Sequence, residues 1–142
     1  MNDSEKLYDE IGVAKHGTYK GIKYFIIDGI FCPCAYIEVP SDLQNLKNLD
    51  NIRKMVSSTV NGGLTYEDTK LCCNNNHLLE DTVVWGWDYG HYTDYCKNLP
   101  GPDVTFMGHK WTIDEIFQEC RNAIDVLITR TYVNKNLQQF YE

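Results

Sequence analysis

The segment VVWGWDYGHYTDY, residues 83–95, joins a strand-forming half to a polar and aromatic half. The valines and tryptophans of its first half favour an extended, buried strand. Gly86 and Gly90 remove side chains where a ligand or another backbone comes close. Beyond Gly90 the residues become polar but stay aromatic. The segment therefore predicts a buried strand that runs out into a functional site.

The course of the chain after Asp88 determines which polar side chains of this segment can meet. In a continuous strand, alternation would put His91 on one face and both aspartates, Asp88 and Asp94, on the other. A turn or helical spacing would instead bring the histidine and the aspartates onto one side. Gly90 makes such a change of direction easy, because glycine tolerates positive φ. We favour the coiled course.

Composition indicates a soluble globular protein. The chain has 142 residues, 43% of them apolar and 23% charged, which suits one domain. Its net charge of −7 argues against nucleic acid as a partner, because duplex binding relies on cationic contacts to phosphate. The first residues, MNDSEKLYDE, lack the apolar core of a secretory signal, and no apolar run is long enough to span a membrane. We expect a cytoplasmic protein with no membrane contact and reduced cysteines; homo-oligomerisation stays open.

A β-hairpin is predicted near the N-terminus. The run KGIKYFIID, residues 20–28, is rich in β-branched and aromatic residues and ends at the turn dipeptide Asp28-Gly29. The following run, IFCPCAYIEVP, contains Pro33, which favours a bulge or an edge position. The regular part of the second strand is therefore expected over residues 34–39.

Two later segments have helical periodicity. The first is weakened by asparagines and predicts a loose helix or a long lid; its apolar positions are Leu43, Leu46, Leu49, Ile52 and Val56. The second begins with the capping box Thr112-x-x-Glu115. Its apolar stripe consists of Ile113, Ile116, Phe117, Cys120, Ile124, Leu127 and Ile128, and its opposite side carries Asp114, Glu119, Arg121 and Asp125.

Together these elements predict one α+β domain, residues 1–142. We expect an antiparallel sheet of about four to six strands with one long C-terminal helix, residues 112–133, packed across it. A short strand is predicted over residues 64–66. Residues 1–17 are acidic and weakly patterned, and are expected to be a flexible arm or a short peripheral element.

The candidate site combines the polar end of residues 83–95 with the Gly62-Gly63 pair. A histidine oriented by a carboxylate suits acid–base catalysis or metal binding, whereas the alternative is that the aspartates only cap turns. We expect both segments to form one pocket. The predicted ligand-binding residues are Gly62, Gly63, Thr65, Tyr66, Trp87, Asp88, His91, Tyr92 and Asp94, of which Asp88, His91 and Asp94 would be catalytic if the protein is an enzyme.

The cysteines do not predict a metal site. The C-P-C spacing of Cys32 and Cys34 is too tight for the usual zinc knuckle, and the adjacent pair Cys72-Cys73 is also unfavourable. Cys96 is close in sequence to His91, but no motif of a cysteine nucleophile surrounds it. We expect neither a metal nor a cofactor.

Three sequence blocks and a closing helix resemble a family of small proteins common in tailed-phage and prophage genomes. In that family the blocks read as an aromatic residue before a Val-Pro strand end, H-G-G-L-T-Y and W-x-G-F-D-x-x-H-x-G-D. Here Asn61 stands where the family has histidine, and Trp87 stands for phenylalanine. The resemblance implies a phage origin and an α+β fold. The matching positions are Tyr36, Val39, Pro40, Gly62, Gly63, Leu64, Thr65, Tyr66, Trp85, Gly86, Asp88, His91 and Asp94.

Three functional hypotheses follow. The first is a phage accessory protein of the host-cell cytoplasm that counters host defence by sequestering a small nucleotide-type signal, without catalysis. The second is an anti-defence inhibitor that binds a host protein through its acidic surface. The third is a hydrolase or phosphodiesterase that uses Asp88, His91 and Asp94. The first is favoured because aromatic residues and paired glycines occur without a complete catalytic set.

Overall fold

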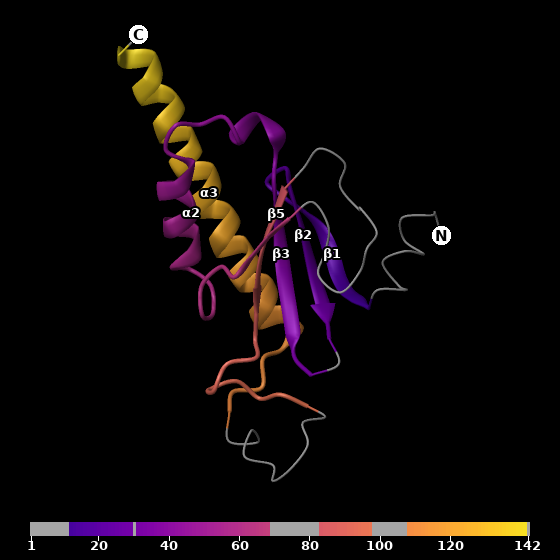
Figure 1. Ribbon diagram of the computed structural model, residues 1–142. Helices are drawn as coiled ribbons and strands as arrows, with labels where there is room; N and C mark the ends of the chain where they lie inside the picture. The colour runs from indigo at the N-terminus through magenta and orange to yellow at the C-terminus, as the bar shows by residue number, and fades with distance from the viewer. Residues whose placement is uncertain (1–11, 30, 69–82, 98–107, 142) are drawn as a thin grey trace.

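The computed structural model describes residues 12–29, 31–68, 83–97 and 108–141, with side chains described up to residue 132. The chain forms one five-stranded antiparallel sheet with strand order β1-β2-β3-β5-β4 (Figure 1). The predicted α+β fold is thereby confirmed. The elements are β1 (Val13–Tyr19), β2 (Ile22–Asp28), β3 (Pro33–Val39), a 3-10 helix (Ser41–Leu43), α2 (Leu49–Ser57), β4 (Tyr66–Asp68), β5 (Val83–Asp88) and α3 (Ile113–Tyr141).

The first hairpin, between β1 and β2, was not expected from the sequence. Its turn consists of Lys20 and Gly21, which both have positive φ, at 50° and 83°. Two-residue turns of this kind match the twist of paired strands, and asparagine or aspartate before the glycine is the usual signal. Lysine stands there instead, so the turn is inconspicuous in the sequence. Residues 1–17 were expected to be a flexible arm or a short peripheral element; residues 13–17 belong to β1, which is an edge strand of the sheet.

The second hairpin, between β2 and β3, is confirmed. Its register runs from Tyr24 opposite Ile37 to Asp28 opposite Pro33. Proline is tolerated at the first position of a strand, because the sheet then lacks only the one hydrogen bond that a proline N–H cannot donate. The connection from Asp28 to Pro33 is longer than the two-residue turn that Asp28-Gly29 predicts.

Strand β5 lies inside the sheet, between β3 and β4, and its side chains alternate between two apolar clusters. Trp85 and Trp87 face the helices and are each 1% exposed. Val84 belongs to the opposite face, together with Tyr36. Gly86 is required between them, because a Cβ atom there would lie 2.6 Å from the Tyr36 ring. The strand predicted at the start of residues 83–95 is thus confirmed.

Helices α2 and α3 pack side by side and cover the Trp85 face of the sheet (Figure 1). The predicted stripe of α3 is confirmed, since Ile116, Cys120, Ile124 and Leu127 are all fully buried. The segment after β3, which was expected to be a loose helix or a long lid, forms the 3-10 helix and α2. Its apolar positions still face the core. In the part of the chain that the structure describes, no helix is both long and apolar enough to cross a bilayer.

The N-terminus of α3 is closed by the predicted capping box. The backbone N–H of Glu115 donates to Thr112 Oγ1 at 3.2 Å, and Glu115 Oε1 accepts from the Thr112 N–H at 3.0 Å. Thr112→Ala should lower the free energy of unfolding by about 1 kcal/mol, because the cap is lost. Urea unfolding measures the change. Thr129→Ala on the exposed part of the same helix is the control and should be neutral or slightly stabilising; equal losses in both variants would contradict a capping role.

Candidate functional site

The chain coils directly after β5, as the favoured alternative predicted. The backbone N–H of Asp94 donates to the carbonyl of His91 at 2.9 Å, which closes a turn. His91 Nδ1 lies 2.9 Å from Asp94 Oδ2, and His91 Nε2 lies 3.7 Å from Asp88 Oδ1. The three predicted side chains therefore meet. Gly90 is needed for a different reason than expected: its φ is not positive, but a Cβ atom there would lie 3.0 Å from Cys32 Sγ.

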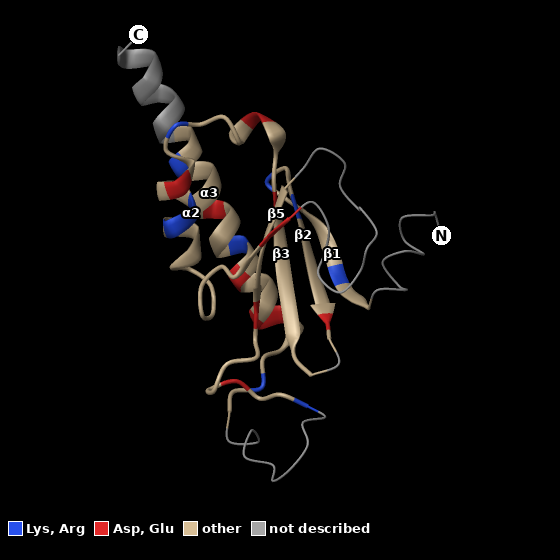
Figure 2. Ribbon diagram, viewed as in Figure 1, with Lys and Arg blue, Asp and Glu red and all other residues tan. Residues whose placement is uncertain are grey.

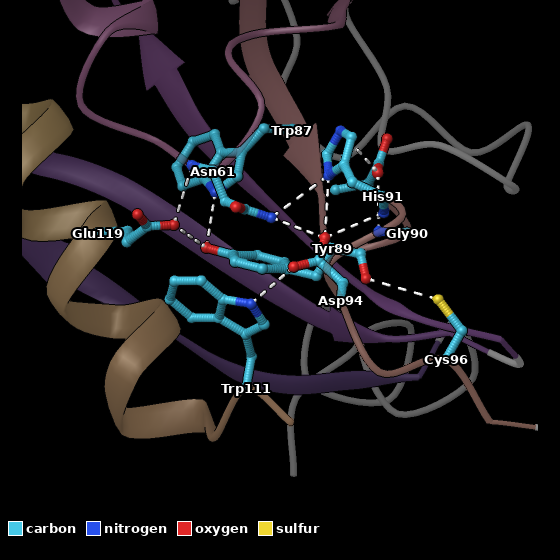
Figure 3. Close-up of polar contacts among 10 residues, drawn as sticks. Asn61, Trp87, Tyr89, Gly90, His91, Asp94, Cys96, Trp111 and Glu119 are labelled. Atoms are coloured by element: carbon cyan, nitrogen blue, oxygen red, sulfur yellow. Dashed lines mark hydrogen bonds and ion pairs between the residues drawn. The ribbon is translucent and has the colours of Figure 1, made fainter. Parts of the chain in front are cut away.

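Asp94 is the centre of the site and is only 2% exposed. Its Oδ2 accepts hydrogen bonds from the His91 N–H at 3.0 Å, from His91 Nδ1 at 2.9 Å and from Asn61 Nδ2 at 2.8 Å. Its Oδ1 accepts from Trp111 Nε1 at 2.9 Å (Figure 3). Burial raises the pKa of Asp94, but these hydrogen bonds outweigh burial and lower the pKa below its usual value. Asp94 is therefore an ionised group that positions its neighbours.

The bond to Asp94 assigns the tautomer of His91. An ionised carboxylate can only accept, so Nδ1 of His91 carries the hydrogen. Asn61 Nδ2 lies 3.3 Å from Nδ1 of His91, but both nitrogens are then donors. Asn61 Nδ2 therefore bonds to Asp94 and not to His91. In the neutral ring, the lone pair of Nε2 remains on the outer edge of the imidazole. The side chain of His91 is 35% exposed, and Nε2 lies 3.7 Å from Asp88 Oδ1.

Gly62 supports the His91 ring. Its φ is +72°, and a Cβ atom would lie 2.3 Å from Cε1 and Nε2 of the imidazole. Gly63 also has positive φ, and a Cβ atom there would lie 2.9 Å from Ser57 Oγ. Gly62 thus leaves room for the His91 ring, and Gly63 leaves room for Ser57 at the end of α2. The prediction that the glycine segment lies beside residues 88–94 is confirmed at Gly62.

A second group of hydrogen bonds links this loop to α3. Trp87 Nε1 donates to Tyr89 OH at 2.8 Å, and Tyr89 OH donates to Glu119 Oε1 at 2.6 Å. The same Oε1 accepts from the Asn61 N–H at 3.1 Å. Burial, followed by the bond to Glu119, strongly raises the pKa of Tyr89, so the phenol stays protonated as a donor. We call Asn61, Gly62, His91, Asp94 and Glu119 the His91 site.

The remaining predicted residues lie in different surroundings. Tyr92 is fully exposed beside His91, and Thr65 is exposed. Trp87 is buried and its N–H is already bound, so it offers no surface to a ligand. Tyr66 packs edge-on against Tyr36 on the far face of the sheet, at a centroid distance of 5.4 Å. Trp87 and Tyr66 thus both make packing contacts within the sheet, and their contact with a ligand stays a prediction.

The cysteines near the site are ordinary thiols. Burial raises the pKa of Cys32 to about 11 and also raises the pKa of Cys96. Cys96 Sγ donates to the carbonyl of Tyr89 at 3.7 Å. A protonated, buried thiol is a poor nucleophile. Among the described residues no three His, Cys, Asp or Glu side chains could hold a metal ion; Cys72, Cys73 and His77 lie outside those residues.

Sequence reasoning missed several members of the site. Asn61 was noted only as a departure from a family pattern, and Glu119 was assigned to the solvent side of α3. Tyr89 and Trp111 were not singled out as partners of the site either. A buried Asp94 needs donors, but nothing local in the sequence says that they come from residues 61 and 111. Comparison of the chain with protein families, curated proteins and solved structures gave no match, so the phage resemblance stays a prediction.

Proposed function

We propose that this protein binds a small nucleotide-type molecule at the His91 site and holds it without converting it. The observation that carries the proposal is the fixed imidazole of His91. Nδ1 bonds to the buried carboxylate of Asp94, the ring packs on Gly62, and the side chain is 35% exposed. A polar group that is oriented before a ligand arrives loses little entropy on binding.

Tyr92 supplies the complementary apolar surface. It directly follows His91, and its side chain is fully exposed. An aromatic ring can stack on a purine or pyrimidine at a low cost in conformational entropy. An exposed stacking surface next to an oriented hydrogen-bonding group suits a ligand with both a base and a polar part.

The cysteines described near His91 are not activated as nucleophiles, which favours binding over turnover. Cys96 is the cysteine nearest in sequence to His91, and its pKa is raised by burial. The Asp94–His91 pair favours a second candidate, a hydrolase in which His91 Nε2 takes a proton from water. Asp88, 3.7 Å from Nε2, would then be the second carboxylate of that site.

The biological role that we propose rests on the phage resemblance. A phage protein that binds a nucleotide signal of the host would lower its free concentration and so counter a defence response. The competing idea of an inhibitor with an acidic surface is less well supported, because α2 and α3 carry Lys or Arg as well as Asp and Glu (Figure 2).

Recovery of the bound molecule tests the proposed function. The protein is incubated with cyclic dinucleotides and with ADP-ribose, freed of unbound nucleotide and denatured, and the released molecule is identified by mass spectrometry. We expect the intact nucleotide in full yield. Tyr92→Ala should weaken binding by about 1–3 kcal/mol, the range for one lost aromatic stack. Tyr132→Ala, an exposed tyrosine on α3, is the matched control and should have no effect.

The other outcomes identify the competing functions. A cleaved product that disappears in His91→Ala would show the hydrolase to be correct and sequestration to be wrong. Absence of any bound nucleotide would overturn the proposal and direct attention to a protein partner.

A further inference from the structure

The His91 coil, by which we mean residues 89–97, is attached to the connection between β2 and β3, and each of these segments carries one cysteine near the attachment. We infer that Cys32 and Cys96 are a redox-sensitive pair, which an oxidant such as hydrogen peroxide joins in a disulfide that secures the coil. The inference goes beyond the proposed function, because it does not depend on what the site binds.

The backbone sets the two cysteines opposite each other. The Lys97 N–H donates to the Phe31 carbonyl at 2.8 Å. In an antiparallel pair, a bond of this kind flanks two directly opposed residues, here Cys32 and Cys96, and the Cα atoms of such residues are about 4.5 Å apart. The matching bond on the other side would need an N–H from Pro33, which proline lacks.

The side chains of the two cysteines also meet. Burial raises the pKa of Cys96, and a hydrogen bond from the side chain of Cys32 partly offsets this effect. Both thiols lie against the start of the coil: a Cβ atom at Gly90 would be 3.0 Å from Cys32 Sγ, and Cys96 Sγ donates to the Tyr89 carbonyl at 3.7 Å. A disulfide requires Cα atoms about 4.4–6.8 Å apart. Opposed residues whose thiols touch can therefore be joined without a large movement of the backbone.

The two other cysteines that the structure describes lie in different surroundings. Cys34 packs with the apolar cluster on the far face of the sheet, where it accepts from Tyr36 OH at 3.6 Å. Cys120 is fully buried in the cluster between the sheet and the helices. Within the described residues the fold thus selects one pair of cysteines for a disulfide.

The reaction consumes one peroxide molecule and releases two waters. Cys32 is partly exposed and Cys96 is buried, so the oxidant meets Cys32 first. The Cys32 thiolate attacks one peroxide oxygen, the O–O bond breaks, and a sulfenic acid and one water form. The Cys96 sulfur then attacks the sulfenic sulfur, whose S–O bond breaks to release the second water. The two thiols lose two protons and two electrons, and the peroxide takes up both.

The acidity of the thiols determines how the pair behaves. Burial raises the pKa of Cys32 to about 11, so little thiolate is present at neutral pH and closure is slow. A pair with a stabilised thiolate gives up its disulfide readily, because its reduced form is favoured. Cys32 and Cys96 lack that stabilisation. We therefore expect a disulfide that forms slowly and is reopened only by an excess of thiol reductant.

Peptide mapping of the oxidised, full-length chain tests the inference. The protein is treated with hydrogen peroxide, its remaining thiols are alkylated, and the digest is analysed by mass spectrometry. We expect a peptide that joins Cys32 to Cys96 and is about 2 Da lighter than the sum of its reduced parts. The melting temperature should rise by about 5–10 °C, because the bond closes a long loop of chain. Dithiothreitol should reverse both changes.

Single variants test the effect on the coil. Amide hydrogen exchange at His91 and Asp94 should slow by about tenfold or more on oxidation of the natural protein, because local opening of the coil is restricted. Cys96→Ser and Cys32→Ser should lose the linked peptide, the rise in melting temperature and the slower exchange. Cys34→Ser is the matched control and should keep all three.

The remaining outcomes would overturn the inference. A disulfide through Cys34, Cys72 or Cys73, or a sulfinic acid on Cys32 without a linked peptide, would show that the pair is not the one that forms. A linked pair with unchanged exchange at His91 would show that the disulfide does not secure the coil. The mapping uses the natural chain, so it decides the matter even if a serine variant does not fold.

Discussion

Asp94→Ala is expected to lower the free energy of unfolding by about 3–5 kcal/mol, the range for breaking a buried charged network. The carboxylate is 2% exposed and accepts from His91, Asn61 and Trp111. Alanine would leave all of these donors without a partner in a place that water reaches poorly. Urea unfolding followed by tryptophan fluorescence measures the loss.

Asp88→Ala is the matched control for this variant. Asp88 is an aspartate of the same loop, but 43% of its side chain is exposed and it lies 3.7 Å from His91. Its loss should cost less than about 1 kcal/mol. Similar values for the two variants would show that Asp94 does not organise the site.

The contribution of Asp94 should also depend on pH in a defined direction. Its pKa in the folded protein lies below the usual value of 3.8. The ionised form is therefore favoured by folding, and the stabilisation is fully present above that value. It is lost as the pH falls from there through the folded-state pKa. The stability difference between the natural protein and Asp94→Asn should shrink over this acidic range and stay constant above about pH 5.

Gly62→Ala should displace His91 and abolish ligand binding. The new Cβ atom would lie 2.3 Å from the imidazole, and the backbone at Gly62 has a φ of +72°. We expect a loss of about 2–4 kcal/mol, of which about 1–2 kcal/mol comes from the left-handed backbone and the rest from the clash. Unfolding curves and the nitrogen chemical shifts of the His91 ring measure the two effects.

Gly21→Ala isolates the backbone contribution. Gly21 has a similar φ of +83°, but no atom lies within 4 Å of the position of its Cβ. This variant should lose only about 1–2 kcal/mol and leave the His91 shifts unchanged. If both alanine variants behave alike, Gly62 does not support the imidazole.

The parts of the fold that follow from local patterns could be predicted. Valines and tryptophans around Gly86 predicted β5, and the capping box with its apolar stripe predicted α3. Both signals lie within one turn or one strand, where residue type directly limits backbone geometry. The Lys20-Gly21 turn is equally local but lacks the usual residue before its glycine, so β1 was missed.

The sequence by itself predicted an antiparallel sheet with one long covering helix, and it favoured the coil that brings Asp88, His91 and Asp94 together. Only the tertiary structure decided what completes the site. Asn61 lies after the end of α2, 30 residues from its neighbour His91, and Glu119 lies in the first turns of α3, 30 residues from its partner Tyr89. The positions of Asn61 and Glu119 beside the coil depend on how α3 packs on the Trp85 face of the sheet. That packing is a sum of many small apolar contacts over the whole core, and no single motif encodes it.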